Sequence, residues 1–167
     1  MPLLNDGRLI DDHWQFISDE DDIPAEGDIV VSPERLKNSF EILVMRNGHL
    51  GVVLDNDADA HDLAPYVDNL ALIALQFPAF TDGRAYSQAR IITTQLNFTA
   101  ELRATGNVLA DQGVFMSRCG FNSFEIDARQ PPPLWLSLAN TMSLAYQQGY
   151  RTRTGFSPRP VTASRAE

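Results

Sequence analysis

The feature that most constrains this fold is an alternation of apolar runs and amphipathic segments that starts near residue 50. The run LALIALQF at residues 70–77 is almost continuously apolar, which is typical of a parallel strand buried on both faces. Helix and strand patterns then alternate along residues 83–96, 100–105, 107–119 and 123–126. This order predicts β/α units whose parallel strands are joined by right-handed crossovers.

Further segments extend the alternation on both sides. LGVVL at residues 50–54 predicts a strand, and the apolar spacing after it predicts a helix that begins near Asp62. Residues 134–148, which follow three prolines, predict a last helix, so the chain contains about four consecutive β/α units. A full eight-unit barrel needs about 250 residues, and 167 residues could form half of one. The predicted sheet is therefore either half-barrel-like or open and mostly parallel.

Residues 1–49 predict an antiparallel extension of this sheet. Short strand patterns at residues 7–10 and 13–17 are joined by two aspartates. Asn47–Gly48 predicts a type I′ hairpin, which makes residues 41–45 and 50–54 antiparallel neighbours.

Helix and domain ends are also readable. Ser32 is expected to cap a short helix that has Pro33 at its first position. Gly120 is placed for a left-handed cap at the end of helix 107–119. Residues 1–150 are predicted to form a single α/β domain, with β/α units from residue 50 onward. Residues 151–167 lack periodicity and are predicted to be a flexible tail.

The charge of the chain is acidic and unevenly distributed. The formal net charge is −9, and nine of the 22 acidic residues lie within residues 1–28. Such a chain is not expected to bind nucleic acid. No apolar run approaches the roughly 20 residues that cross a bilayer, and the first residues do not resemble a signal peptide. We therefore expect no membrane association and a cytoplasmic location.

A candidate anion site follows the strand pattern of residues 70–77. Thr81 or Asp82 is suited to cap the next helix, Gly83 permits close approach to the backbone, and Arg84 adds a positive charge. Free N–H groups and the positive end of the helix dipole favour a small oxyanion or a partner's carboxylate there. The alternative is purely structural: Asp82 caps the helix, Arg84 pairs with an acid, and nothing binds.

Glu101 and Arg103 form a second candidate pair. They lie two residues apart in a predicted strand and therefore point to the same side. Charged side chains on a sheet face need a partner or water. Either this face opens on a cavity, or the strand lies near an edge of the sheet, which the sequence slightly favours.

Residue types that commonly carry catalysis are sparse. The three histidines are scattered and Cys119 is the only cysteine, so no metal site is predicted. Cys119 ends a predicted helix and is expected in the core, far from Arg84. Glycine-rich nucleotide-binding loops and a serine-hydrolase elbow are absent. The cofactor is therefore unassigned, and whether the chain is an enzyme stays open.

Two stretches, FPAFTDGRAYSQAR at residues 77–90 and ELRATGNVLADQGVFMSRCGFNSFE at residues 101–125, resemble a bacterial family known as domain of unknown function 934. Its members are commonly encoded beside assimilatory sulfite reductase and described as oxidoreductases of sulfite reduction. The resemblance implies a role in sulfur assimilation. This chain has Thr94 and Asn107 where the family often has arginine and aspartate.

Two functions follow from these observations. In the first, the chain is a non-catalytic accessory protein that docks on sulfite reductase or its electron donor, with acidic residues 1–28 steering a basic partner. In the second, it is an oxidoreductase-type enzyme that binds sulfite or another small oxyanion with Arg84 and its neighbours. The first is slightly favoured, because no redox group is evident from the sequence. A structural subunit, or a homodimer formed across an open sheet edge, is a third reading.

Overall fold

The structure is a computed structural model that describes residues 3–5, 8–79, 81–126, 130, 131 and 133–135. Its strands are β1 (Leu3–Asn5), β2 (Arg8–Ile10), β3 (Gln15–Phe16), β4 (Ile29–Val31), β5 (Leu50–Leu54), β6 (Leu72–Phe77), β7 (Glu101–Gly106) and β8 (Ser123–Glu125). The α-helices are α1 (Pro33–Val44), α2 (Arg84–Thr94) and α3 (Gly113–Cys119). Three short 3-10 helices are η1 (Ala60–Leu63), η2 (Val67–Asn69) and η3 (Ala110–Gln112).

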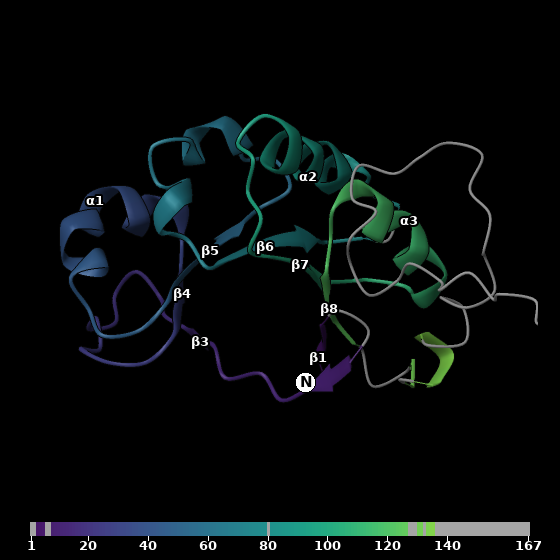
Figure 1. Cartoon of the computed structure of the whole chain (residues 1–167), viewed down its shortest axis with the longest axis horizontal. Helices are drawn as coiled ribbons and strands as arrows, with labels where there is room; N and C mark the ends of the chain where they lie inside the picture. The colour runs from purple at the N-terminus through teal and green to yellow at the C-terminus, as the bar shows by residue number, and fades with distance from the viewer. Residues whose placement is uncertain (1–2, 6–7, 80, 127–129, 132, 136–167) are drawn as a thin grey trace, which may run out of the picture.

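The strands form one curled sheet, a half-barrel with its helices on the convex side (Figure 1). The strand order is β2-β1-β8-β7-β6-β5-β4-β3. Neighbours from β3 to β8 are parallel, whereas β1 pairs antiparallel with both β8 and β2. The curled form decides between the two sheets that the sequence left open.

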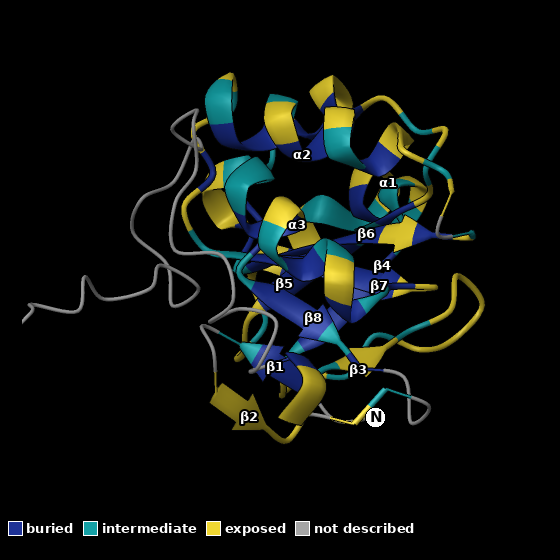
Figure 2. Ribbon diagram, turned by 90° about the vertical axis from the view of Figure 1, so that its right-hand side faces the viewer, coloured by how far each residue is buried: buried dark blue, intermediate teal, exposed yellow. Residues whose placement is uncertain are grey.

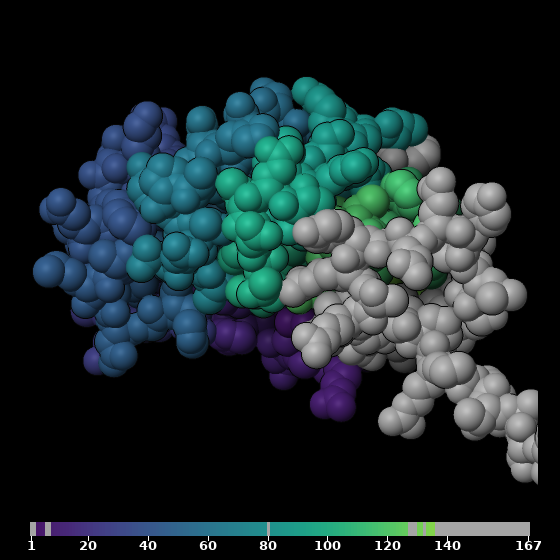
Figure 3. Space-filling model, turned by 45° about the horizontal axis from the view of Figure 1, so that its top comes forward, coloured from purple at the N-terminus to yellow at the C-terminus, as the bar shows by residue number. Residues whose placement is uncertain are grey.

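The crossovers are less regular than four β/α units. The repeat already starts at β4, which α1 connects to β5. Between β5 and β6 the chain forms only η1 and η2, where one helix starting near Asp62 was predicted. Pro65 lies between these two turns, and its missing N–H disfavours one continuous helix. Figure 3 shows the outer surface on which α1, this segment and α2 follow one another. Of the helix predicted at residues 134–148, all but Leu134 and Trp135 lies outside the described residues.

The hairpin predicted at Asn47–Gly48 is wrong. α1 covers most of the first predicted strand, and β5 runs parallel to β4. α1 buries Leu36 and Leu43 on one side, whereas Ile42, Val44 and Met45 of the predicted strand are exposed. Gly48 serves a different purpose, because a Cβ there would lie 2.2 Å from the carbonyl oxygen of Gly27. Close backbone packing and a positive φ of 147° both require this glycine, although no hairpin forms here.

The two N-terminal strand patterns do not pair with each other either. β2 pairs with β1, and β3 pairs in parallel with β4, so β2 and β3 become the two edges of the sheet. Residues 11–14, the crossing segment, run from one edge to the other across the open side of the half-barrel (Figure 1). An isolated two-stranded ribbon is marginally stable in water. Each of these strands instead forms hydrogen bonds with one neighbour at an edge of the larger sheet.

Other element ends match the sequence. Ser32 caps α1 by accepting a hydrogen bond from the backbone N–H of Arg35 at 3.0 Å, with Pro33 at the first position. α1 spans 12 residues in total and is kinked at Ser39, whose φ of −125° and ψ of 19° are not helical. The predicted helix at residues 83–96 corresponds to α2, and Gly120 takes the left-handed cap position after α3 with φ of 114°.

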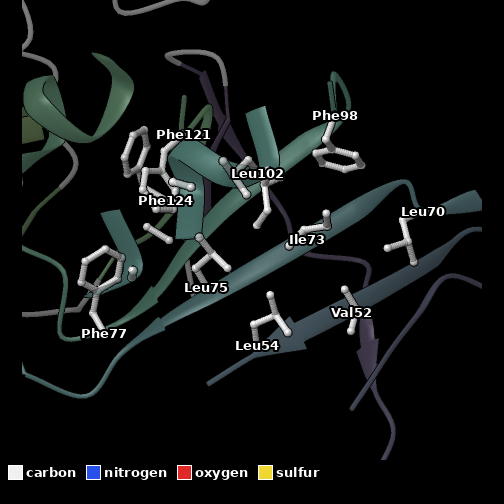
Figure 4. Close-up of a cluster of buried hydrophobic side chains, with 14 of the residues drawn as sticks. Val52, Leu54, Leu70, Ile73, Leu75, Phe77, Phe98, Leu102, Phe121 and Phe124 are labelled. Carbon is white, nitrogen blue, oxygen red and sulfur yellow. The ribbon is translucent and has the colours of Figure 1, made fainter. Parts of the chain in front are cut away.

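The centre of the sheet is buried on both faces. Figure 4 shows Val52, Leu54, Ile73 and Leu75 projecting from one face of β5 and β6 into the main core. Side chains of the opposite face, among them Leu72 and Ala74, are also fully buried. In Figure 2 the buried colour accordingly runs through the central strands, and the exposed colour lies on outer helix faces, on loops and on the edge strands β2 and β3.

Gly120→Ala is expected to destabilise the fold by about 2 kcal/mol or more. The substitution strains a positive-φ position, and the added Cβ would lie 2.4 Å from Cγ2 of Thr93. Gly27→Ala is the matched control, since its φ is also positive and nothing lies within 4 Å of the added Cβ. Urea unfolding measures both losses. Adding Thr93→Ser to Gly120→Ala should recover part of the stability, and equal losses at the two glycines would contradict the steric argument.

Candidate functional site

The predicted anion site lies in the loop between β6 and α2, at the carboxyl edge of the parallel strands. α2 begins at Arg84, with Gly83 as its N-cap. Neither Thr81 nor Asp82 is the capping residue, but Asp82 Oδ1 accepts a hydrogen bond from the backbone N–H of Arg84 at 3.2 Å. A carboxylate of the chain itself therefore contacts the first helical N–H group.

Asp82 also binds the Arg84 side chain. Nη2 of Arg84 lies 2.7 Å from Oδ2 of Asp82, and Nε lies 3.1 Å from Oδ1. Asn56, from the loop after β5, donates a third hydrogen bond to Oδ2. These contacts, the Arg84 side chain first, lower the pKa of Asp82 to about 2, and the same pairing raises the pKa of Arg84. Asp82 thus occupies the position that an external anion would take.

The lowered pKa of Asp82 makes the stability of the fold depend on pH. The carboxyl pKa is lower in the folded chain than its ordinary value of 3.8. The Asp82 contribution to stability is therefore complete above pH about 4 and is lost as the pH falls toward about 2.

Glu101 and Arg103 lie on the concave face of the sheet. β7 lies between β6 and β8, so the edge position that the sequence slightly favoured is wrong. Leu102 belongs to the core beneath the helices, and its two neighbours in β7 therefore point to the opposite face. Local sequence could not reveal this position, because it depends on which strands pair on either side.

Arg103 is a buried cation held by two carboxylates. Its side chain is 1% exposed, Nη1 lies 2.9 Å from Oδ2 of Asp12, and Nη2 lies 2.8 Å from Oε1 of Glu101. Nε donates a further hydrogen bond to the same Glu101 oxygen. Asp12 belongs to the crossing segment, so this guanidinium connects the middle of β7 to the chain that spans the open side. The sequence separation of 91 residues hid this partner.

The structure does not combine the two predicted groups into one site. Asp82 and Arg84 lie beyond the carboxyl end of β6, whereas Arg103 lies within β7 on the concave face. No hydrogen bond or ion pair joins the two groups among the described residues. Arg84 is more than half exposed and Arg103 is buried, so only Arg84 is accessible to a ligand from solution.

A pocket that the sequence did not indicate lies on the concave face. It measures about 410 Å³ and is lined by residues of five strands and the turns after them: Phe16, Val53, Gln76, Phe77, Pro78, Thr105, Gly106 and Glu125. This concave pocket lies at the carboxyl ends of the parallel strands, where ligands of α/β proteins commonly bind. Gln76, Thr105 and Glu125, each a polar residue near the end of its strand, are the residues from which the sequence could have indicated it.

A second pocket, of about 580 Å³, lies between α1 and the segment around η1. His61 lies in its wall and shares its ring nitrogens with Gln95 Oε1 at 2.9 Å and Asp59 Oδ1 at 2.8 Å. Hydrogen bonding to these two groups, Gln95 first, raises the pKa of His61. The contacts join η1 to the end of α2, which gives this histidine a structural role.

Cys119 lies half-buried at the end of α3, as part of the packing around the core. Burial raises the pKa of its thiol, which keeps it protonated and poorly nucleophilic at neutral pH. Burial likewise raises the pKa of Tyr86 to about 12. Within the described ranges, no group of three or more histidine, cysteine, aspartate and glutamate side chains is arranged to hold a metal ion.

The comparisons with known proteins give a family. The model of the family described as "Bacterial protein of unknown function (DUF934)" matches residues 51–156, which is more than half of the chain. The chain belongs to this family. The match includes α2, β7, α3, Asp82–Arg84 and Arg103. No curated protein matches the chain, and no solved structure does. In the part of the chain that is described, no helix combines the length and apolar character needed to span a bilayer.

Arg103→Met is expected to destabilise the protein by about 3 kcal/mol, because it leaves Glu101 and Asp12 as partly buried carboxylates without their cation. Arg84→Met is the matched control, since it removes the same charge from an exposed ion pair that contributes little. Urea unfolding measures the free energy of unfolding of both variants, and its slope against urea concentration should stay as in the wild type. A loss for Arg103→Met no larger than that for Arg84→Met would show that the buried cation does not hold the crossing segment.

Proposed function

We propose that this chain is a non-catalytic accessory protein of assimilatory sulfite reduction that docks on sulfite reductase or its electron donor. The family resemblance supplies the metabolic context. The observation that supports docking is an exposed acidic loop, residues 18–28, whose backbone is fixed by two arginines.

The two arginines bind the acidic loop through its carbonyl groups. Arg35 donates from Nη1 to the carbonyl oxygen of Ser18 and from Nη2 to that of Asp21. Arg46 donates to the carbonyl oxygens of Pro24 and Gly27, the latter at 2.8 Å. Because these guanidinium groups bind the backbone, they order the loop without pairing directly with its carboxylates.

The carboxylates of the acidic loop divide into two sets. Three carboxylates anchor the loop. Asp19 accepts a hydrogen bond from Ser32 Oγ at 2.6 Å, and Asp21 accepts one from the backbone N–H of Ser18 at 3.1 Å. Asp28 lies between His13 and His49, 3.0 Å from Nε2 of the first and 2.9 Å from Nδ1 of the second. Glu20, Asp22 and Glu26 are exposed, and their side chains have no partner among the described residues. A preordered loop with outward carboxylates offers a basic partner a complementary surface at a small cost in entropy.

The chemistry of the described side chains agrees with an accessory role. Cys119 is kept protonated by burial, and Arg84 is already neutralised by Asp82. Docking needs neither a reactive thiol nor a free cation. It needs an ordered charged surface, and the acidic loop provides one.

The double variant Glu20→Gln/Asp22→Asn is expected to weaken binding to sulfite reductase, or to its electron donor, by about tenfold at low salt, because it removes two exposed charges. The affinity is measured by immobilising the partner, either the sulfite reductase holoenzyme or its electron donor, on a surface and titrating it with this chain. Wild-type binding should also weaken between about 50 and 300 mM salt, as exposed charges are screened.

The matched control is Glu41→Gln/Asp68→Asn, which changes the net charge equally at exposed positions outside the acidic loop. It should leave the affinity unchanged. If both double variants weaken binding equally, the effect comes from net charge and not from the acidic loop. If the chain binds neither candidate partner at low salt, the docking proposal is refuted.

The alternative function is that of an enzyme that binds sulfite or another small oxyanion at Asp82, Gly83 and Arg84. It requires Arg84 to exchange Asp82 for the anion, and the exposure of Arg84 permits such an exchange. The measurement is thermal unfolding with and without sulfite. Under this alternative, sulfite stabilises the wild type and the exposed control Arg90→Ala but not Arg84→Ala. Equal stabilisation of all three chains, or none, would exclude an anion site at Arg84.

A further inference from the structure

The concave pocket holds a row of three polar side chains at one level of the sheet. Gln76 of β6 is paired with Thr105 of β7 in the strand register. In the next ladder Ala104 is paired with Phe124, which places Glu125 of β8 beside Thr105. All three line the pocket, and their side chains reach it from adjacent parallel strands.

The charge of this row is negative. Among the described residues that line the concave pocket, Glu125 is the only charged one. It is partly buried, and it forms no ion pair with another described residue. A partly desolvated carboxylate is stabilised by a cation within reach. The nearest charged residue on this face of β7, Arg103, is already bound by Asp12 and Glu101.

Two further residues describe the surroundings of the pocket. Ser123 lies two residues before Glu125 on the same face, is fully buried, and its Oγ has no hydrogen-bond partner among the described residues. β8 thus carries a second polar side chain on the concave face, next to Glu125. Phe16, which also lines the pocket, is 53% exposed, so its ring is accessible to a ligand.

We propose that the concave pocket binds a small organic cation, a primary ammonium or guanidinium compound with a short apolar body. Glu125 pairs with the cationic group, while Thr105 and Gln76 accept hydrogen bonds from it. Phe16 and Val53 pack against the apolar body, and the aromatic ring adds a cation–π contact. The volume of about 410 Å³ lies within the range of small-molecule sites. The net charge of −9 favours a cation over an anion.

Three probes of one size and different charge test this assignment: phenethylamine, 2-phenylethanol and phenylacetate. Each is titrated to about 10 mM into the isotope-labelled full chain, and backbone amide shifts are followed by NMR. Phenethylamine is expected to give saturable shifts at the amides of Gln76, Thr105, Gly106 and Glu125. The alcohol should bind more weakly by about tenfold or more, and phenylacetate should not bind.

The variants separate the pocket from unspecific attraction to an acidic protein. Glu125→Gln keeps the shape of the side chain and should weaken phenethylamine binding by about tenfold, and Phe16→Ala should weaken it severalfold. Glu41→Gln removes an exposed charge outside the pocket and should have no effect. The same spectra show whether each variant is folded.

Three results would overturn the proposal: no saturable shifts up to the highest concentration, equal affinity for phenylacetate, or shifts centred on the acidic loop. The experiment uses the isolated chain and needs no partner protein. Its outcome is therefore independent of whether the chain docks on sulfite reductase.

Discussion

Parallel hydrogen bonding between β5, β6 and β7 is the interaction on which the rest of the structure depends. β6 pairs with β7 along its whole length and with β5 along most of it, and side chains on both of its faces are buried. Because parallel strands end at the same edge of the sheet, the loops that follow β5, β6 and β7 lie on one side of the molecule. Both the Asp82–Arg84 pair and the concave pocket lie at that side.

The curl of the sheet turns its second face into an interior. Residues 11–14 pass across the open side, and Arg103 reaches them from the middle of β7 through Asp12. Two arginines of similar local sequence context thus have different roles. Arg84 forms an exposed pair with an acid two residues away, whereas Arg103 joins segments 91 residues apart in a buried environment. Burial, and not residue type, separates these roles.

Much of the β/α part could be predicted from the sequence, because its signals are local. The apolar run around Ile73 and Leu75, the stripe that includes Ala85 and Ala89, and the glycine at 120 each carry their structural meaning within a few residues. The ion pair between Asp82 and Arg84 could likewise be predicted from the sequence, since the two residues lie two positions apart. The predictions failed where two structures share one local pattern, as at Asn47–Gly48.

The sequence by itself determined the class of fold, the ends of several elements and the family to which the chain belongs. Tertiary structure alone decided that the sheet curls, that β2 and β3 become its edges, and that Gln76, Thr105 and Glu125 form one row. The physical reason is that hydrophobic period and capping act within a helical turn or a strand. Strand order, burial of Arg103 and the concave pocket depend instead on pairings between distant segments. The free energy of such pairings cannot be read from a short stretch of sequence.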